Sequence, residues 1–380
     1  MSTSVEQYFA LLRAAIWNHL VEIKGEIDWR AVMKLAEHHA TVTLICDVAS
    51  QMTDDLQPSQ KMMGWMKQQM RANFAFHLRL KQTMLLAIKT LREHGIEPVL
   101  LKGFSLAQYY PNPDMRQFGD IDLFVGLDDF HESCALLRGL PGAYSWEEEK
   151  EVGRHYNVEF GDYSIEIHRV TSELSDSKQS ALYAEMERQG LFLHSQRVDL
   201  DGASVTIPSK EFMVFYTFYH AWQHFQTSGV GWRQLCDIAL TLHYYHGQLD
   251  LGQLAADLTS LHLLKPWKAF GYLMVKWLGL PEAEMPFYDA SARRSARKVY
   301  QYIMEEGNFK RSHAVRPFVP KKINTFINIL MDFFRMVRVF PALAFNDLAC
   351  SVKYGFGKIN SGKTGSGKKS TKKMNFFLAV

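Results

Sequence analysis

The sequence predicts an α/β fold in which a small mixed sheet lies between two helical regions. Helical periodicity dominates the first 70 residues and returns after residue 208, whereas residues 96–170 contain short apolar runs with alternating polar positions. Apolar residues three or four apart indicate amphipathic helices, and alternation at a spacing of two indicates strands. The change of period therefore places the sheet in the middle of the chain.

The composition is that of an ordinary folded protein. Of the 380 residues, 47% are hydrophobic and 22% charged, and 43 basic against 40 acidic residues give a net charge of +3. This near balance does not favour nucleic acid as a partner, although it leaves a local basic patch open. The four cysteines form no Cys-x-x-Cys pair, which suits a reducing compartment.

The segments that target a protein to a membrane are not expected here. The N-terminus lacks the basic and apolar regions of a secretory signal. The most apolar stretch, residues 323–344, is interrupted by Asp332, Arg335 and Arg338, whereas a membrane span needs roughly 18 apolar residues in a row. We therefore predict a cytoplasmic protein without a membrane partner, and the sequence leaves its oligomeric state open.

The expected elements follow one another in a definite order. A long helix is expected from about residue 71 to residue 94, ended by Gly95. The expected strands are 96–101, 118–125, 156–160 and 163–170. A helix at 127–137 separates the second strand from the third, and Gly161 and Asp162 join the last two in a hairpin.

This order divides the chain into four segments. An N-terminal helical region is expected at 1–70, a mixed core at 71–207, a C-terminal helical domain at 208–354 and a flexible tail at 355–380. The tail is rich in Gly, Ser and Lys. It nearly spells a phosphate-binding loop, but Lys369 stands where that motif needs Ser or Thr. We interpret it as a solvated basic tail.

The most informative segment is residues 116–125, which read RQFGDIDLFV. Alternate side chains of a strand share a face, so Asp120 and Asp122 point the same way while their apolar neighbours point into the core. Two like charges this close repel each other. A divalent cation removes that cost, and hard carboxylate oxygens suit Mg²⁺, with Mn²⁺ as the alternative.

A third carboxylate lies on a later expected strand. In residues 163–169 the two isoleucines face the core, so Glu166 and His168 share the opposite face. If this strand lies beside the strand of Asp120 and Asp122, three carboxylates converge and can hold two cations roughly 3.5–4 Å apart. Glu166 would then complete the metal site or remove a proton, and His168 is a supporting residue or a less favoured base.

A phosphate-binding turn is expected upstream. Lys102 and Gly103 lie where a strand ends and a helix is expected to begin. Glycine lets the backbone approach a phosphate, Lys102 offsets its charge, and Ser105 can donate a hydrogen bond. Arg116 adds a forked donor. With His168, these residues form the predicted phosphate contacts.

The order of strand, Lys-Gly turn, helix, Gly-Asp-x-Asp and later Glu resembles the DNA polymerase β-like nucleotidyltransferase superfamily. Within it, Leu-Leu-Lys-Gly, Arg116 and Gly-Asp-Ile-Asp-Leu-Phe-Val are similar to a bacterial family of uncharacterised nucleotidyltransferases, nucleotidyltransferase family 5. The Glu-Ile-His run at 166–168 and the helix with His220 and His224 fit the same family. The resemblance covers about residues 75–245. The superfamily usually places Gly and Ser side by side, whereas Phe104 separates them here.

The resemblance implies a polymerase β-type core, Mg²⁺, a nucleoside triphosphate such as ATP, and transfer of a nucleoside monophosphate with release of pyrophosphate. The acceptor is not defined; a small molecule or a protein hydroxyl is favoured. Two other classes stay open: a catalytically inactive scaffold that binds or regulates, and a membrane-surface protein that uses the C-terminal helices and the basic tail. Retention of all three acids favours the enzyme. His220 and His224 lie on one helix face, but no HExxH pattern accompanies them, so a packing role is expected.

Overall fold

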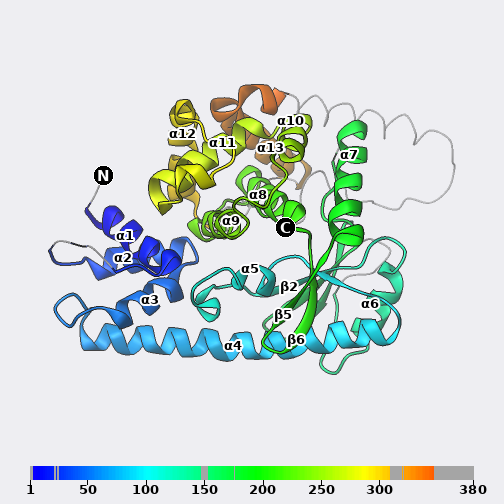
Figure 1. The fold of residues 1–380 in the computed structure, drawn as a ribbon, viewed down its shortest axis with the longest axis horizontal. Coiled ribbons are helices and arrows are strands. Elements are labelled where there is room, and N and C mark those ends of the chain that lie inside the picture. Colours follow the sequence, from blue (N-terminus) through cyan, green and yellow to red (C-terminus); the bar gives the residue numbers. More distant parts are fainter. Residues whose placement is uncertain are drawn as a thin grey trace.

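The computed structural model describes residues 3–345 apart from 21, 22, 24, 147–152, 175, 309–318 and 320. Its α/β fold confirms the predicted class: a mixed sheet lies among helices from both ends of the chain (Figure 1). The expected tail at 355–380 lies outside the described residues. The expected division into four segments stays a proposal.

The six strands of the sheet lie in the order β3-β4-β2-β1-β6-β5. Their bounds are β1 Val99–Leu100, β2 Asp120–Phe124, β3 His155–Glu159, β4 Ser164–His168, β5 Gln196–Leu200 and β6 Ala203–Ile207. The pairs β2–β4 and β1–β6 are parallel, and the other neighbours are antiparallel. The four expected strands are present, including the β3–β4 hairpin. The β5–β6 hairpin was not predicted.

The N-terminal helices are α1 (Thr3–Trp17), α2 (Trp29–His38), α3 (Val42–Gln51) and α4 (Gln60–Glu93). The expected long helix is present as α4, but it begins at Gln60, where Ser59 caps it through its side chain. Gly95 ends it as expected: its φ is 81°, and the backbone N–H of Ile96 returns to the Leu91 carbonyl at 3.0 Å.

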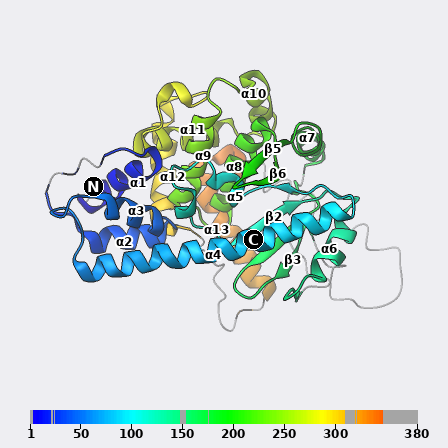
Figure 2. The same cartoon turned by 60° about the horizontal axis from the view of Figure 1, so that its bottom comes forward.

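The sheet is covered on both faces. Helix α4 extends from the N-terminal helices to α6 (Phe130–Arg138) and packs on the face that carries Ile121 and Leu123 (Figures 1 and 2). The opposite face packs against α8 (Lys210–Gln226). Tyr216 of α8 lies in one buried apolar cluster with Val99 and Phe124 of the sheet. The alternation predicted for β2 is thus confirmed.

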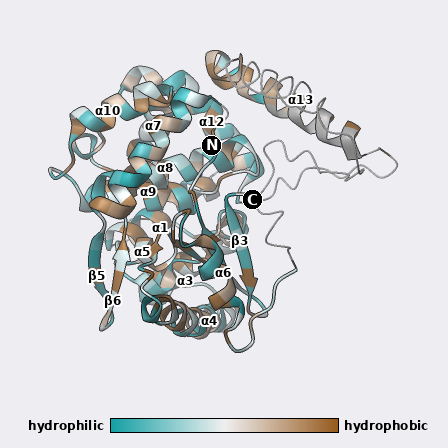
Figure 3. Cartoon of the chain, turned by 90° about the vertical axis from the view of Figure 1, so that its right-hand side faces the viewer, coloured by the Kyte–Doolittle hydropathy of each residue, from teal (hydrophilic) through white to brown (hydrophobic). Residues whose placement is uncertain are grey.

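Two of the remaining helices, α5 (Phe104–Ala107) and α7 (Ser177–Glu187), lie between strands of the sheet in the sequence. The others follow α8: α9 (Trp232–Tyr244), α10 (Leu251–Ser260), α11 (Leu264–Leu273), α12 (Arg293–Glu306) and α13 (Lys321–Val339). Helix α13 lies at the edge of the molecule (Figure 3). Its Arg335 contacts Glu306 of α12 at 2.7 Å and lies over the Phe225 ring of α8 at 4.8 Å. None of the helices in the described residues is both long and apolar enough to span a bilayer.

Candidate active site

The three predicted carboxylates lie on adjacent parallel strands. In the β2–β4 ladder, Asp120 is opposite Ser164 and Asp122 is opposite Glu166. Residues in register on neighbouring strands point to the same face. The strand of Glu166 therefore lies beside the strand of Asp122, which is the arrangement that the convergence of three carboxylates requires.

Asp122 is the most buried of these carboxylates. Its side chain has no exposed surface, and its Oδ1 accepts from Lys102 Nζ at 2.9 Å and from His168 Nε2 at 3.0 Å. Its Oδ2 is buried and has no hydrogen-bond partner among the described residues. A buried carboxylate oxygen without a partner is costly, which indicates a place for a cation.

The pKa of the Asp120 carboxyl is raised by its surroundings. Burial raises the pKa of its carboxyl to about 6, and the nearby charge of Asp122 acts in the same direction, while Lys102 opposes it. Like charges thus lie close together on this face of the sheet, and Lys102 offsets them only in part. A carboxyl whose pKa is raised in this way is more frequent at functional sites than elsewhere.

Glu166 is held by two histidines. Its Oε2 lies 3.3 Å from His168 Nε2 and 4.0 Å from His155 Nε2. Burial raises the pKa of Glu166, but the hydrogen bond from His168 and the charges of His155 and Lys102 bring it well below its usual value. One ligand atom from each of these three residues, Glu166 and the two histidines, lies within 4.8 Å of the others.

The Lys-Gly turn places Lys102 beside the carboxylates. Gly103 has φ 63° and ψ −113°, a conformation that favours glycine, and a Cβ there would meet the Phe118 ring at 3.2 Å. The hydroxyl of Ser105 is buried and donates to the Lys102 carbonyl at 3.2 Å. Ser105 therefore holds the turn in this structure, and its predicted phosphate contact stays a prediction.

His220 and His224 lie beside the site, where the sequence favoured a packing role and left a supporting role open. Lys102 Nζ donates to His220 Nε2 at 3.0 Å, so that nitrogen is an acceptor and His224 Nε2, 3.1 Å away, must donate to it. Ser228 then donates to His224 Nδ1 at 2.7 Å. Burial first and the Lys102 charge second lower the pKa of both histidines, that of His224 to about 3. The i, i+4 spacing was the available signal.

Arg116 lies behind the turn. Its Nε and Nη2 donate to the two carboxylate oxygens of Asp237 at 2.7 and 2.8 Å, and its Nη1 reaches the Gly103 carbonyl at 3.4 Å. The residue is only 2% exposed. The structure therefore does not bring Arg116 together with the carboxylates as a free forked donor, and its contacts support the Gly103 turn instead.

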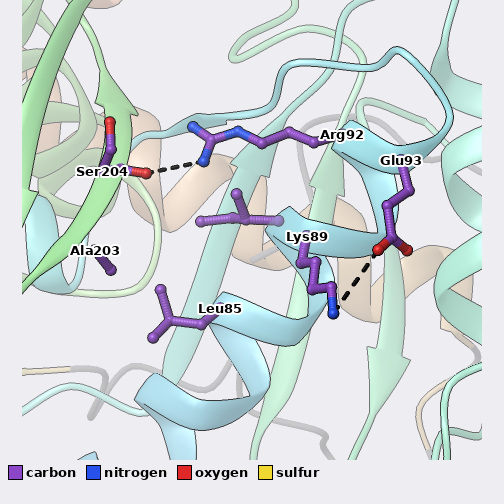
Figure 4. A pocket seen from close by; sticks show the side chains of 7 residues that line it. Leu85, Lys89, Arg92, Glu93, Ala203 and Ser204 are labelled. Carbon is purple, nitrogen blue, oxygen red and sulfur yellow. Dashed lines mark hydrogen bonds and ion pairs between the residues drawn. The ribbon is translucent and has the colours of Figure 1, made fainter.

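A separate groove of about 420 Å³ lies between α4 and the β5–β6 hairpin (Figure 4). Its lining contains no predicted site residue. Lys89 pairs with Glu93 at 3.8 Å, and Arg92 donates to the Ser204 carbonyl at 2.9 Å. Arg92 also pairs with Glu97 at 2.6 Å. The basic groups of this groove are thus paired within the protein, and none of its lining residues belongs to the β2–β4 face.

A mixed sheet with paired carboxylates on adjacent strands is the arrangement that the resemblance to nucleotidyltransferases implies. The chain belongs to a family of uncharacterised nucleotidyltransferases, whose profile matches residues 25–279. This match confirms the resemblance found in the sequence and extends it at both ends. Membership of the family supports an enzyme that transfers nucleoside monophosphates.

Two solved structures are similar to this chain at low identity. The antibiotic-resistance factor ANT(2'')-Ia is 12% identical, with 48% of this chain and 92% of that chain covered and a TM-score of 0.34. An antigenic nucleotidyltransferase-like protein from Paracoccidioides brasiliensis is 15% identical, with 56% and 95% covered and a TM-score of 0.33. These scores carry no argument about substrate. Among curated proteins, none matches the chain significantly.

Proposed function

We propose that this protein transfers a nucleoside monophosphate from a nucleoside triphosphate to a hydroxyl acceptor at the site of Asp120, Asp122 and Glu166. One observation carries the proposal above all others. Asp122 and Glu166 lie in register on parallel strands, and the second oxygen of Asp122 is buried without a partner among the described residues. All three carboxylates are present, which favours the enzyme over the inactive scaffold.

The residues present fit a divalent cation. Asp120, Asp122 and Glu166 offer hard oxygen ligands. The Oδ2 atom of Asp122 has no hydrogen-bond partner among the described residues and is free to bind the cation. Mg²⁺ or Mn²⁺ held here would supply charge neutralisation for the triphosphate and for the pentacoordinate transition state at phosphorus. The proposed role of Glu166 is therefore that of the third ligand.

The other side chains of the site would bind and orient the triphosphate. The Lys102 ammonium has three N–H donors, of which two point to Asp122 and His220, so the third is available for a phosphate oxygen. Gly103 lets that oxygen approach the backbone, and Arg116 fixes the turn through Gly103 and Asp237. We propose Arg116 as a positioning residue, and for Ser105 we keep the proposed phosphate contact beside its hydrogen bond within the turn.

The proposed reaction balances without a further reagent. The acceptor oxygen forms a bond to the α-phosphorus, and the bond from that phosphorus to the bridging oxygen of the β-phosphate breaks. Pyrophosphate leaves with the electron pair, and the acceptor proton passes to a site carboxylate or to water. A small alcohol, a sugar or a protein hydroxyl fits this reaction, and the near-neutral charge of the chain favours these over long nucleic acids.

Label transfer tests the proposal. The protein is incubated with each α-³²P-labelled nucleoside triphosphate, Mg²⁺ or Mn²⁺, and separate small-molecule and protein fractions of a cell extract. We expect transfer of label with equal release of pyrophosphate, and a loss of at least about a hundredfold in Asp120→Asn/Asp122→Asn. Asp162→Asn, in the exposed β3–β4 turn, is the matched control. Equal label transfer by the double variant would overturn the assignment.

A further inference from the structure

We propose that His168 is a direct ligand of the bound cation through Nε2, so that the site has a mixed carboxylate–imidazole character. Such a site takes Mn²⁺ or a related first-row transition metal in preference to Mg²⁺. The inference rests on the proposed function and deepens it, because it concerns the same site. It gives His168, predicted from the sequence as a supporting residue, a phosphate contact or a less favoured base, the different role of a metal ligand.

The ligand atoms already lie at the spacing that one ion requires. His168 Nε2 is 3.0 Å from Asp122 Oδ1 and 3.3 Å from Glu166 Oε2. Two atoms that are each about 2.1 Å from one ion at angles between 90° and tetrahedral lie about 3.0–3.4 Å apart. Both distances from His168 fall in this interval. The imidazole nitrogen is therefore spaced from each carboxylate as two ligands of one ion would be, and a cation there would take the place that the Lys102 ammonium holds beside Asp122 Oδ1.

Burial gives an independent reason for a ligand at this point. The side chains of His168 and Asp122 are 2% and 0% exposed, and Asp122 Oδ2 has no hydrogen-bond partner in the described part of the chain. Solvent therefore does not satisfy that oxygen. A cation that Asp122 holds through both carboxylate oxygens, together with Glu166 and His168, would satisfy it and would replace the contacts that His168 now makes with both acids.

The distances to the carboxylates distinguish His168 from His155. Arg154 Nε donates to His155 Nδ1 at 3.3 Å, so a neutral His155 carries its proton on Nε2, the nitrogen that faces Glu166. That nitrogen is then a donor. His168 Nε2 also donates in this structure, to Asp122 and Glu166, so binding a cation there requires its proton to leave or to move to Nδ1. The distances favour His168 over His155 as the ligand, because His168 Nε2 lies within 3.3 Å of both carboxylates and His155 Nε2 lies 4.0 Å from Glu166.

The ligand set decides the class of cation. Carboxylate oxygens alone suit Mg²⁺, whereas imidazole nitrogen suits first-row transition metals, whose affinities rise from Mn²⁺ through Co²⁺. One nitrogen beside two carboxylates therefore shifts the preference away from Mg²⁺. The full chain should bind Mn²⁺ at least about tenfold more tightly than Mg²⁺.

The test uses the full-length protein freed of metal by chelation and then loaded with Mn²⁺. The electron paramagnetic resonance signal of free Mn²⁺ gives the affinity, and pulsed measurements of ¹⁴N coupling report whether nitrogen binds the ion. We expect ¹⁴N coupling in the wild type and in His155→Gln, and its loss in His168→Gln with an affinity about tenfold lower or weaker still. Circular dichroism of the variants confirms that each is folded.

The outcomes separate the inference from the proposed function. Mn²⁺ bound without ¹⁴N coupling, or coupling that survives His168→Gln, overturns the role of His168 and leaves the carboxylate site intact. If ¹⁴N coupling were lost in His155→Gln but kept in His168→Gln, the ligand would be His155, and the proposed role of His168 would be overturned. Failure of the wild type to bind either Mn²⁺ or Mg²⁺ contradicts the proposed function itself.

Discussion

Asp122 of β2 and Glu166 of β4 are register partners on parallel strands. Because successive side chains of a strand alternate between faces, a slip of one residue in this ladder would turn Glu166 away from Asp122. The apolar partners of the same ladder, Ile121 with Ile165 and Leu123 with Ile167, are buried on the opposite face. Core packing therefore fixes the register, and the register brings the carboxylates together.

The crowding of carboxylates predicts that Asp120 destabilises the metal-free protein. Its pKa is raised from 3.8 to about 6 in the folded state. The folded state thus holds the proton more tightly than the unfolded state, and stability is lost as the pH rises through about 6. In the presence of a chelator at pH 7.5, Asp120→Asn should raise the free energy of unfolding by about 3 kcal/mol.

Urea unfolding at two pH values checks this prediction. The gain from Asp120→Asn should disappear near pH 3.5, because the carboxyl is then protonated in both states. Asp162→Asn, at an exposed carboxylate, should change stability by less than about 0.5 kcal/mol. An Asp120→Asn protein less stable than the wild type at pH 7.5 would argue against crowding.

The Arg116–Asp237 pair predicts a structural role for Arg116. Both side chains are almost fully buried, at 3% and 4% exposure. Arg116→Met leaves the Asp237 carboxylate buried without its cation, which should cost about 3–5 kcal/mol. The exposed pair of Arg79 with Asp162 is the control, and Arg79→Met should cost less than about 1 kcal/mol. Equal midpoints in urea for the two variants would contradict the prediction.

Two glycines predict opposite effects of the same substitution. Gly103→Ala places a Cβ 3.2 Å from the Phe118 ring at a φ of 63°, and should cost about 1–3 kcal/mol. Gly64→Ala, inside α4 with open space around it, should stabilise by roughly 0.5–1 kcal/mol. Thermal melts of both variants measure the signs. If Gly103→Ala left the melting temperature unchanged, the turn at Lys102 would not need glycine.

The central part of the fold could be predicted from the sequence because its signals are local. Alternation identified β2, β3 and β4, and Gly95 marked the end of α4. The β5–β6 hairpin was missed although Asp201-Gly202 is a hairpin turn signal, since the β5 side chains are only half-buried or exposed and form no apolar run. The start of α4 at Gln60 was missed for a similar reason: its first turns expose many polar residues.

The carboxylates could be predicted, but their cationic partners could not. Alternation is a property of one strand, so the shared face of Asp120 and Asp122 follows from the sequence. The contact of Lys102 with His220 joins the strand end to α8, and the pairing of Arg116 with Asp237 joins a loop to α9. Such contacts depend on how helices pack on the sheet, which no local pattern contains. Arg116 therefore looked like a free phosphate donor.

The measurement that tests the central claim most directly is a thermal-shift screen of the four nucleoside triphosphates. Each is added with and without Mg²⁺ or Mn²⁺ to the wild type and to Asp120→Asn/Asp122→Asn. At a ligand concentration about 100 times Kd, binding should stabilise the wild type by about 2.7 kcal/mol. We predict cation-dependent stabilisation by at least one triphosphate and its loss in the double variant. Equal stabilisation of the double variant, or no stabilisation of the wild type by any of the four, would contradict the account.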